Sequence, residues 1–316
     1  MNTIFDPNDP HCGVVTMKNT HLYRVHTCTG DLDCTCASRF REHGHAPAAL
    51  PAPGDEVHLV RISAGVGQIL EIFPRRNVFA RRSAVPMPSA HAHEQIIAAN
   101  VHQVIPVFAV AQPVPRWHLL DRYLVSAESA GIPAIICITK LDLLEPNGDA
   151  RDLETALDDY RCIGYPVIST SGLTGAGLDE LKSALKGRLT VLVGKSGVGK
   201  TSLLNLLQPG LGLRVQETSR ASGRGRHTTT QLEMFPLEAG GAVIDTPGIR
   251  EFGLWGVADD DLAMFFPEMR PYLGRCRFGL GCAHAEEPGC AIRQAVNSGL
   301  ISPYRYQSYL RLKEQP

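Results

Sequence analysis

The chain has 316 residues, of which 44% are hydrophobic and 20% are charged, and its formal net charge is -1. This composition does not indicate disorder and is typical of an ordinary soluble chain long enough for two or three cores. Because the global charge is close to neutral, any attraction to nucleic acid must come from local basic patches.

The first residues, MNTIFDPNDP, lack the cationic start and apolar run of a secretory signal, and no apolar stretch reaches membrane-spanning length. The nine cysteines are an odd number, which favours thiols or metal ligands over a disulfide framework. We therefore expect a cytoplasmic location and no membrane partner. A monomer is a separate expectation.

Residues 13–80 predict a small β-barrel of about five short strands separated by glycine-containing turns. A Pro-rich stretch at 46–55 is expected to be a loop that crosses between the two halves of the barrel. The predicted strands are GVVTM, HLYRVHTC, DEVHLVRI and GQILEIF, and the other turns are TGDLD and SAGVG.

Residues 101–193 predict a parallel α/β sheet, because apolar runs alternate with helical patterns. Gly240 and Gly241 then suit a hairpin turn between the strands QLEMFPL and GAVIDTPG. In chain order the earlier elements are the strand VHQVIPVFAV, a helix with Leu119, Leu120, Tyr123, Leu124 and Ala127 on one face, the strand PAIICIT, a helix over 152–160, the strand PVISTS, the helix GLDELKSALK and the strand LTVLVG.

The segment GKSGVGKT at 194–201 matches the phosphate-loop pattern G-x-x-x-x-G-K-[ST] and joins an apolar strand to the helix TSLLNLLQ. Its glycines allow backbone N–H groups and the helix N-terminus to surround a phosphate; a plain glycine-rich turn is the alternative. We expect Lys200 to reach the β- and γ-phosphates and Thr201 to ligate Mg²⁺. The other expected nucleotide contacts in this loop are Gly194, Lys195, Ser196, Gly197, Val198, Gly199 and Ser202.

Two later segments supply what a triphosphate site still lacks. In DTPG, Asp245 is predicted to hold hydrated Mg²⁺ and Gly248 to donate its N–H to the γ-phosphate. In the loop GRGRHTTT, Thr229 is the first candidate for a further Mg²⁺ ligand and Thr228 is the second. A solvated linker is the alternative interpretation of this loop.

The motif TKLD, in which Leu141 separates Lys140 from Asp142, indicates which base of the nucleotide is bound. An aspartate accepts hydrogen bonds from N1–H and the exocyclic amine of guanine, whereas adenine offers an acceptor at N1 and no amine at C2. Asp142 is predicted to make these bonds, the Lys140 stem to cover the ring, and Thr139 to brace the loop. Taken alone, TKLD fits a surface loop equally well.

The base motifs precede the phosphate loop, so the nucleotide domain is predicted to be circularly permuted. After TKLD, the segment TSGLTGAGLDEL offers backbone N–H groups near Ser171 and Gly172 to guanine O6. The DTPG loop runs directly into the C-terminal segment, so the nucleotide state should bias the position of that segment.

Helical patterns return after residue 248, in DDDLAMFFPEM, PGCAIRQAVNSG and SPYRYQSYLRLKEQ, around a cysteine-rich loop. Three thiolates and one imidazole in this loop fit one closed, structural Zn²⁺ site. The predicted ligands are Cys276, Cys282, His284 and Cys290.

A second group of metal-binding residue types lies near the N-terminus. Cys28 and Cys34 flank an expected hairpin turn, where paired buried thiols are a sufficient explanation, and a metal site is the alternative. The group also includes Cys36, His43 and His45.

The chain resembles the bacterial small-ribosomal-subunit-dependent GTPase A (RsgA) family over residues 13–313 in the order of its segments. That order is a barrel, then TKLD, TSG, GKSGVGKTS, GRGRHTTT and DTPG, and finally a Cys/His knot. The resemblance implies an oligonucleotide-binding (OB) barrel, a permuted GTPase and a zinc domain. It also implies a role late in small-subunit maturation, with hydrolysis stimulated by that subunit. His102 stands where the family usually has aspartate, and Thr139 replaces a more frequent asparagine.

Ile249 follows DTPG where many GTPases have a glutamine that orients water, and an apolar side chain cannot do this. We hypothesise that His227 positions the attacking water, with Thr229 and Lys200 as the other catalytic residues. An exposed loop histidine is the alternative for His227.

Two arginine-rich runs are candidates for contacts with RNA phosphates, although each run alone fits a solvated surface equally well. The expected barrel and the family resemblance favour RNA. In RRNVFARR, Phe79 could stack on an unpaired base at the exit of the barrel. The arginines concerned are Arg75, Arg76, Arg81 and Arg82 in this run and Arg220, Arg224 and Arg226 near GRGRHTTT.

The expected fold class is α/β: a circularly permuted P-loop GTPase domain with an N-terminal OB-fold β-barrel and a C-terminal, mainly helical zinc domain. The expected domains are 1–82, 83–253 and 254–316. The expected activity is Mg²⁺-dependent hydrolysis of GTP to GDP in assembly of the small ribosomal subunit, with that subunit and its rRNA as partners. An RNA-binding scaffold that holds GTP with little turnover is the alternative, and a trafficking-type GTPase is disfavoured by the absence of a lipidation motif.

Overall fold

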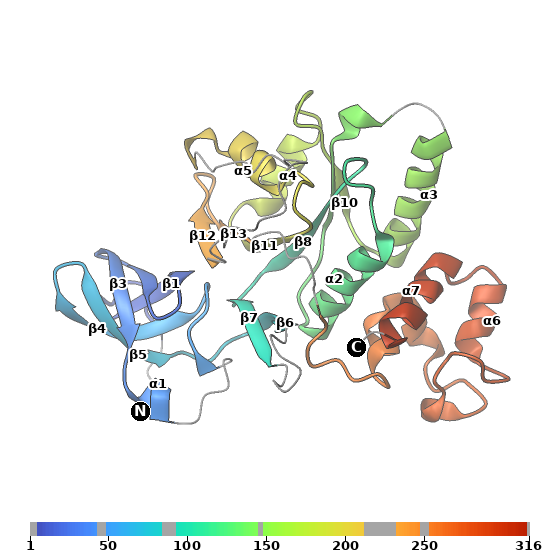
Figure 1. Ribbon diagram of the computed structural model, residues 1–316, viewed down its shortest axis with the longest axis horizontal. Helices are drawn as coiled ribbons and strands as arrows, with labels where there is room; N and C mark the ends of the chain where they lie inside the picture. The colour runs from blue at the N-terminus through green and yellow to red at the C-terminus, as the bar shows by residue number, and fades with distance from the viewer. Residues whose placement is uncertain are drawn as a thin grey trace, which may run out of the picture.

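The computed structural model describes residues 5–42, 49–83, 93–144, 148–211, 232–246 and 253–314. A β-barrel, an α/β region and a helical C-terminal region follow one another along the chain and lie side by side in that order (Figure 1). Within the described ranges, no helix combines the length and apolar character needed to cross a bilayer.

The barrel is formed by β1 (Cys12–Lys18), β2 (Tyr23–Thr27), β3 (Gly30–Cys36), β4 (Glu56–Ser63) and β5 (Val66–Ile72). Its strands run in the order β1-β2-β3-β5-β4, and pairing of β4 with β1 closes it. Alternate side chains point inward, as the period of a strand requires. The inward set is Val15, Tyr23, Val25, Leu32, Cys34, Val57, Leu59 and Ile69.

The interpretation of TGDLD as a turn was wrong, because most of it belongs to β3. The turn itself lies just before, at Cys28 and Thr29, and Gly30 adopts a φ of 112° there. Since Asp31 and Asp33 point away from the core and only Leu32 between them is buried, the strand is polar on its outer face. A short helix, α1 (Arg39–Glu42), follows β3.

The α/β region has a parallel sheet with β8 (Gln103–Ala109), β9 (Ile136–Thr139), β10 (Val167–Ser169), β11 (Leu189–Val193) and β13 (Ala242–Asp245). Its order is β10-β9-β8-β11-β13, and β12 (Leu232–Pro236) adds an antiparallel strand beside β13. Gly240 and Gly241, with φ values of 83° and 89°, form the predicted hairpin turn between β12 and β13.

Helices cover both faces of this sheet. On one face lie α2 (Trp117–Ser129) and α3 (Gly148–Ile163), and on the other lie α4 (Leu178–Leu185) and α5 (Lys200–Leu207). In β8, Val104 and Phe108 face the first pair and Ile105 and Val107 face the second. Strands buried on both faces need continuous apolar runs, which is the pattern that predicted them.

The run RRNVFARR does not form the predicted RNA-stacking surface. Phe79 is fully buried in β6 (Val78–Arg82), which pairs with β7 (Glu94–Ala99) and packs against α2. Arg75 forms a bidentate ion pair with the buried Asp55, with both N–O distances at 2.7 Å. These two side chains therefore stabilise the fold, and the prediction of an RNA contact fails for them.

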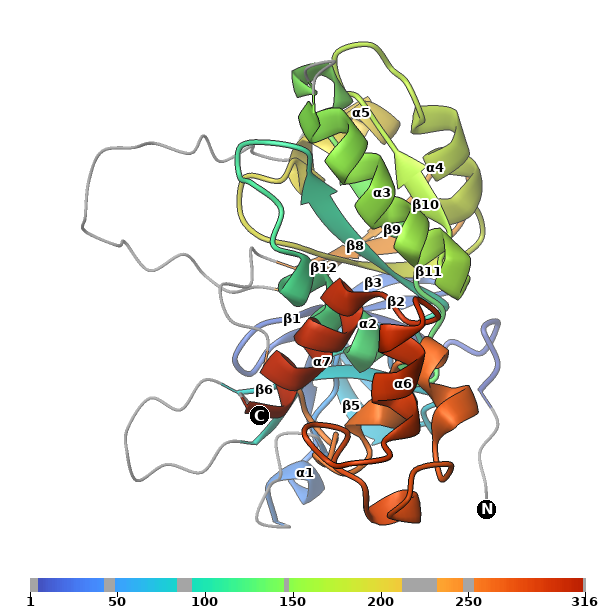
Figure 2. The same ribbon diagram turned by 90° about the vertical axis from the view of Figure 1, so that its right-hand side faces the viewer.

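The C-terminal region contains η4 (Leu262–Phe265), η5 (Pro267–Tyr272), η6 (Gly279–Gly281), α6 (Ala291–Asn297) and α7 (Pro303–Glu314). The predicted helix DDDLAMFFPEM is present only as the 3₁₀ turns η4 and η5. Pro267 and Pro271 cannot donate the backbone hydrogen bonds of a continuous α-helix. Both views place α7 beside α2 (Figures 1 and 2), and Val125 of α2 belongs to the C-terminal core.

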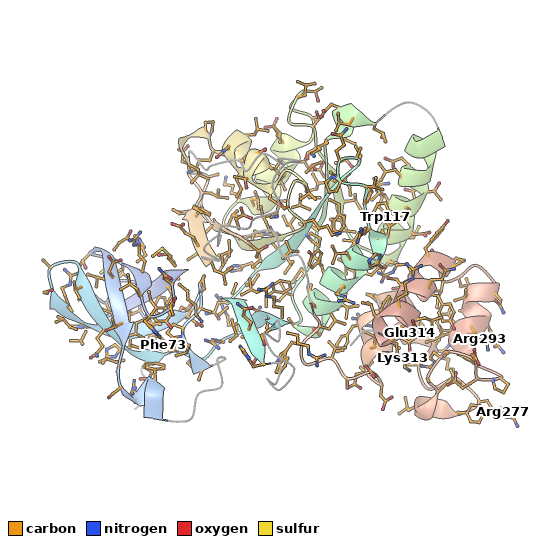
Figure 3. The ribbon with its side chains drawn as sticks, viewed as in Figure 1. Phe73, Trp117, Arg277, Arg293, Lys313 and Glu314 are labelled. Carbon is orange, nitrogen blue, oxygen red and sulfur yellow. The ribbon has the colours of Figure 1, made fainter. Side chains whose placement is uncertain are left out.

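A buried ionic network joins α7 to the α/β region. The guanidinium of Arg305 bonds Asp121 of α2 and donates to Glu268 of η5, with 2.7 Å between Nε and Oε1. It also lies 4.6 Å from the ring centroid of Phe266 and 5.3 Å from that of Tyr160. Tyr160, on which Trp117 packs (labelled in Figure 3), donates to Asp121 across 2.7 Å.

Arg305→Met is expected to lower the free energy of unfolding by about 3–5 kcal/mol, because it leaves two buried carboxylates without their counter-charge. Urea denaturation measures this loss. Arg311→Met removes an exposed arginine from the same helix and should change stability by no more than about 0.5 kcal/mol. Equal losses of unfolding free energy in the two variants would contradict a stabilising role for the Arg305 ion pairs.

Candidate nucleotide site and metal centre

The predicted nucleotide motifs lie at one edge of the parallel sheet. Asp142 follows β9, Ser171 follows β10, the phosphate loop follows β11, and Asp245 ends β13. Ligands of open α/β sheets bind outside the carboxyl ends of the strands, so these segments share the edge where such a ligand would lie.

The phosphate loop has the backbone that its glycines allow. Gly199, with a φ of 98°, precedes the first residue of α5. At Gly194, which has a φ of 155°, a Cβ atom would lie 2.4 Å from the carbonyl oxygen of Val107. A side chain at Gly194 would therefore force the loop away from β8.

Lys200 is buried at the start of α5. Its ammonium donates to Gly194 O at 2.8 Å and to Lys195 O at 3.3 Å, which turns the side chain back over the loop. Burial lowers the pKa of Lys200, and the nearby carboxylate of Asp245 opposes this effect. A buried cation held in such a loop suits an anionic ligand such as a phosphate.

Asp245 presents an oxygen suited to a cation. Burial raises the pKa of this carboxyl group, whereas Lys200 and a hydrogen bond from Thr201 lower it. Its Oδ1 is buried and makes no hydrogen bond. Because an unpaired buried carboxylate oxygen is costly, the adjacent Thr201 hydroxyl and Asp245 fit a hard cation such as Mg²⁺.

The base motif and the phosphate loop are in direct contact. The hydroxyl of Thr139 lies 2.5 Å from Val198 O, and the ammonium of Lys140 lies 2.8 Å from Gly197 O. These side chains join β9 to the loop after β11, although more than fifty residues separate each pair. The prediction that the base motif and the phosphate loop meet in space is confirmed.

Asp142 and the segment after β10 are also adjacent. The Ser171 hydroxyl donates to Asp142 Oδ1 at 2.5 Å, and it accepts from the N–H groups of Leu173 and Thr174. The backbone N–H of Ser171 already donates to Ala176 O at 3.1 Å. Gly172 is therefore the better candidate of the two predicted donors to guanine O6.

Several contributors were missed by the sequence analysis. Gln112, in the loop after β8, accepts a hydrogen bond from Lys140 through its carbonyl oxygen. Thr246 is buried, and its hydroxyl donates to Leu192 O at 2.7 Å, which fixes the chain after Asp245 to β11. Only the neighbouring motif signals Thr246, and no local pattern signals Gln112.

His102, which stands where the resembled family usually has aspartate, lies away from this site. His102 precedes β8, and its Nδ1 accepts from the N–H of Leu189 at 3.0 Å, at the amino ends of β8 and β11. Burial and the nearby Arg76 and Arg188 lower the pKa of this imidazole. The substitution therefore leaves the nucleotide edge unchanged.

Part of the predicted site lies outside the described residues. This applies to the predicted catalytic residue His227, to the Mg²⁺ candidates Thr229 and Thr228, and to Gly248. Ile249 and the arginines Arg220, Arg224 and Arg226 also lie there.

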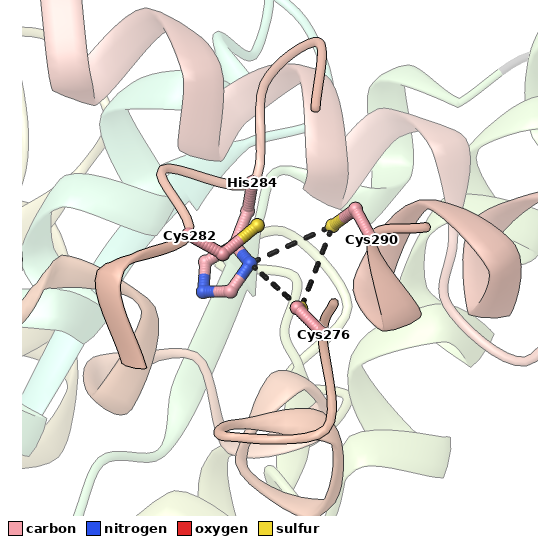
Figure 4. A group of neighbouring side chains, drawn as sticks. All are labelled: Cys276, Cys282, His284 and Cys290. Atoms are coloured by element: carbon pink, nitrogen blue, oxygen red, sulfur yellow. Dashed lines mark hydrogen bonds between the residues drawn. The ribbon is translucent and has the colours of Figure 1, made fainter. Parts of the chain in front are cut away.

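The four predicted zinc ligands come together in the C-terminal region (Figure 4). Their donor atoms lie within 4.8 Å of one another, and all four residues are buried. The sulfurs of Cys276 and Cys290 are 3.9 Å apart, and the Nδ1 of His284 is 3.5 and 3.6 Å from them. Tetrahedral thiolates at about 2.3 Å from zinc would be about 3.8 Å apart, so the spacing fits.

The protonation of these groups agrees with a cation site. Burial lowers the pKa of His284, which favours the neutral imidazole that binds metals. Burial, together with the sulfurs of Cys276 and Cys290, raises the pKa of Cys282 to about 12. A thiolate therefore forms at Cys282 only when a cation compensates its charge.

Polar side chains that the sequence analysis missed hold the metal loop in place. Glu287 accepts from the N–H groups of Ala283 and Ala285, both at 2.9 Å. From α7, Tyr306 donates to His284 O at 2.7 Å. Tyr309 and Lys313, the latter labelled in Figure 3, each donate to Ala283 O at 3.0 Å. Such outer contacts orient ligands, and they tie the loop to α7.

The second cysteine group does not have the arrangement expected for it. Cys34 is buried in the barrel, but Cys28 is exposed and its thiol donates to Asn8 O at 3.4 Å. The expectation of paired buried thiols was therefore wrong for Cys28, which lies in the turn itself. Within the described part of the chain, the C-terminal group alone has the spacing of a metal site, and His43 and His45 lie outside that part.

Comparisons with known proteins agree with this geometry. The sequence profile of the RsgA GTPase family matches residues 72–255. A small ribosomal subunit biogenesis GTPase RsgA from Gemmatimonas aurantiaca is 42% identical over 306 residues, which cover 96% of each chain. The protein of the same name from Pseudomonas aeruginosa is 43% identical over 267 residues, covering 84% of this chain and 76% of its own.

Solved structures show the same architecture. The crystal structure of YjeQ from Thermotoga maritima matches with a TM-score of 0.75 at 31% identity, over 96% of this chain and 97% of its own. YloQ, described as a circularly permuted GTPase, matches with a TM-score of 0.70 at 29% identity, over 99% and 96% of the two chains. The fold is thus that of a circularly permuted GTPase with a barrel before it and a helical region after it, and the chain belongs to the RsgA GTPase family.

Proposed function

We propose that the protein hydrolyses GTP to GDP and phosphate during biogenesis of the small ribosomal subunit, with that subunit and its rRNA as partners. The observation that carries the proposal is the contact of Thr139 and Lys140 with the phosphate loop. This contact brings two distant segments together, which supports one nucleotide site built from both. The names of the relatives support the ribosomal role.

Different residues are proposed to bind the phosphates and the magnesium ion. Backbone N–H groups of the loop from Gly194 to Gly199 face the phosphates, and Lys200 neutralises their charge. Asp245 and Thr201 would hold Mg²⁺, which supplies charge stabilisation to the transferring phosphoryl group. His227 is proposed to position the attacking water, and Thr229, or else Thr228, to complete the magnesium site.

Asp142 is proposed to select guanine. One carboxylate oxygen already accepts from Ser171, which orients the group, and the carboxylate then accepts from N1–H and the exocyclic amine. The N–H of Gly172 would donate to O6. Adenine lacks the amine and would leave the carboxylate unpaired, so it is rejected.

The metal centre is proposed to hold one structural Zn²⁺ through Cys276, Cys282, His284 and Cys290. Four protein ligands fill a tetrahedral site and leave no position for water, so the centre stabilises the fold and performs no chemistry. The divisions at residues 82 and 253, the monomeric state and a cytoplasmic location remain part of the proposal.

GTP turnover with and without purified small ribosomal subunits tests this function. We expect stimulation of at least about tenfold, which equals about 1.4 kcal/mol of activation free energy. Lys200→Ala should abolish turnover in both conditions, whereas Lys182→Ala, at an exposed lysine of α4, should behave as the unaltered protein. Binding of GTP without stimulated turnover would instead favour the RNA-binding scaffold.

A further inference from the structure

The barrel and the α/β sheet share hydrogen-bonded strands. Met17 and Lys18 at the end of β1 pair with Glu233 and Leu232 of β12. Figure 1 shows β12 at the edge of the α/β region that faces the barrel. One eleven-stranded sheet therefore runs without interruption from the strands of the α/β region into the barrel.

The register of this sheet places a barrel residue in one row with the proposed magnesium ligand. Glu233 pairs with Met17 on one side and with Asp245 on the other. Directly opposed residues of antiparallel strands are about 5 Å apart, so the Cα atoms of Met17 and Asp245 are separated by about 10 Å. One strand, β12, is all that lies between them.

We infer that the end of β1 positions Asp245 through β12, so that a ligand of the barrel and a cation at Asp245 influence each other. This inference rests on the nucleotide site proposed above. Without β1, β12 would be an edge strand held only by β13. Displacement of β12 would move the backbone of Asp245 relative to Thr201 and Lys200.

The barrel is fixed at a second place, which leaves little room for it to move independently. Ala99 donates to Pro53 O at 2.9 Å, and Asn100 donates through Nδ2 to Gly54 O at 3.0 Å. A Cβ atom at Gly54 would lie 2.2 Å from Ala99 O, so the two backbones are in close contact. The barrel is therefore held against the α/β region at two places, and the end of β1 keeps a defined position beside β12.

Base recognition should be independent of this connection. The base motifs follow β9 and β10, and the strands β8, β11 and β13 separate β9 from β12. Coupling through β12 should change the Mg²⁺ concentration that turnover requires, and it should leave the preference for guanine over adenine unaltered. A general loss of stability would affect both properties.

Amide hydrogen exchange of the full chain tests the inference. We expect Mg²⁺ with a non-hydrolysable GTP analogue to slow exchange at Met17 and Lys18 by at least about tenfold relative to GDP in EDTA. The outer barrel strands β3 and β5 should not respond. Asp245→Asn should abolish the response at β1 while the loop from Gly194 to Gly199 stays protected by nucleotide.

The outcomes separate the two proposals. Nucleotide protection of the phosphate loop without any response at β1 would overturn the inference alone. Absence of protection at both places would overturn the proposed nucleotide site, and the inference with it. An equal response of β1, β3 and β5 would indicate global stabilisation and would also overturn the inference.

A pair of variants at Leu232 gives a second readout. Leu232 pairs with Lys18, and the pairing of β12 with β13 begins one residue later. Leu232→Pro removes a backbone donor, whereas Leu232→Ala keeps it and removes only the side chain. We expect the proline variant alone to need at least about tenfold more Mg²⁺ for half-maximal turnover, with an unchanged GTP-to-ATP preference. Equal Mg²⁺ requirements in the two variants would contradict the inference.

Discussion

Asp142→Asn is expected to lower the affinity for GTP by roughly 10⁴-fold and to create affinity for xanthosine triphosphate. The asparagine side chain keeps one acceptor oxygen, so it can accept from N1–H of guanine, but its amide nitrogen then places a donor against the exocyclic amine. Xanthine has a carbonyl oxygen at the same position, to which the amide nitrogen can donate. Titration calorimetry with GTP, ATP and xanthosine triphosphate measures all three affinities.

Asp179→Asn is the matched control for this change, because Asp179 is an exposed aspartate in the first turn of α4. It should leave all three affinities within about twofold. If Asp142→Asn also left GTP binding intact, the base would be recognised elsewhere, and the assignment of TKLD would be wrong.

Removal of the metal from the C-terminal centre, by a chelator or by Cys290→Ser, is expected to unfold much of that region. Structural zinc contributes about 10 kcal/mol or more to the folding of small zinc domains. The cysteine ligands also belong to the core that contains Phe266 and Tyr309. Amide exchange in α6 and α7 should therefore accelerate by at least about 10³-fold, equal to about 4 kcal/mol.

Cys162→Ser is the control for this experiment, since Cys162 is an exposed cysteine of α3. It should leave the metal content and the exchange rates unchanged. Exchange in the barrel should stay slow in both variants, because the barrel has its own core. Unaltered protection of α6 and α7 after metal loss would contradict a structural role for the metal.

Much of the candidate site could be predicted because the residues that carry its chemistry lie close together in the sequence. In the phosphate loop, the glycines, Lys200 and Thr201 are contiguous, and their geometry follows from one strand–loop–helix unit. The four metal ligands lie within one loop, so their spacing already limited the geometry. The alternation of apolar runs and helical patterns likewise predicted the parallel sheet.

Errors arose where a local pattern had more than one physical outcome. Arg75 and Phe79 have the composition of an RNA contact, yet one pairs with Asp55 and the other is buried against α2. The polar alternation of TGDLD is compatible with a turn and with an exposed strand. Burial decides between such outcomes, and it depends on residues that are distant in the sequence.

The sequence by itself determined which chemical groups the protein carries: a phosphate-loop motif, the TKLD motif and a Cys/His cluster that could hold a metal. The tertiary structure alone decided which distant segments meet, through contacts such as Thr139 with Val198, Arg305 with Asp121 and β1 with β12. The physical reason is that a motif is defined by neighbours along the chain, whereas burial, ion pairing and strand register are set by neighbours in space.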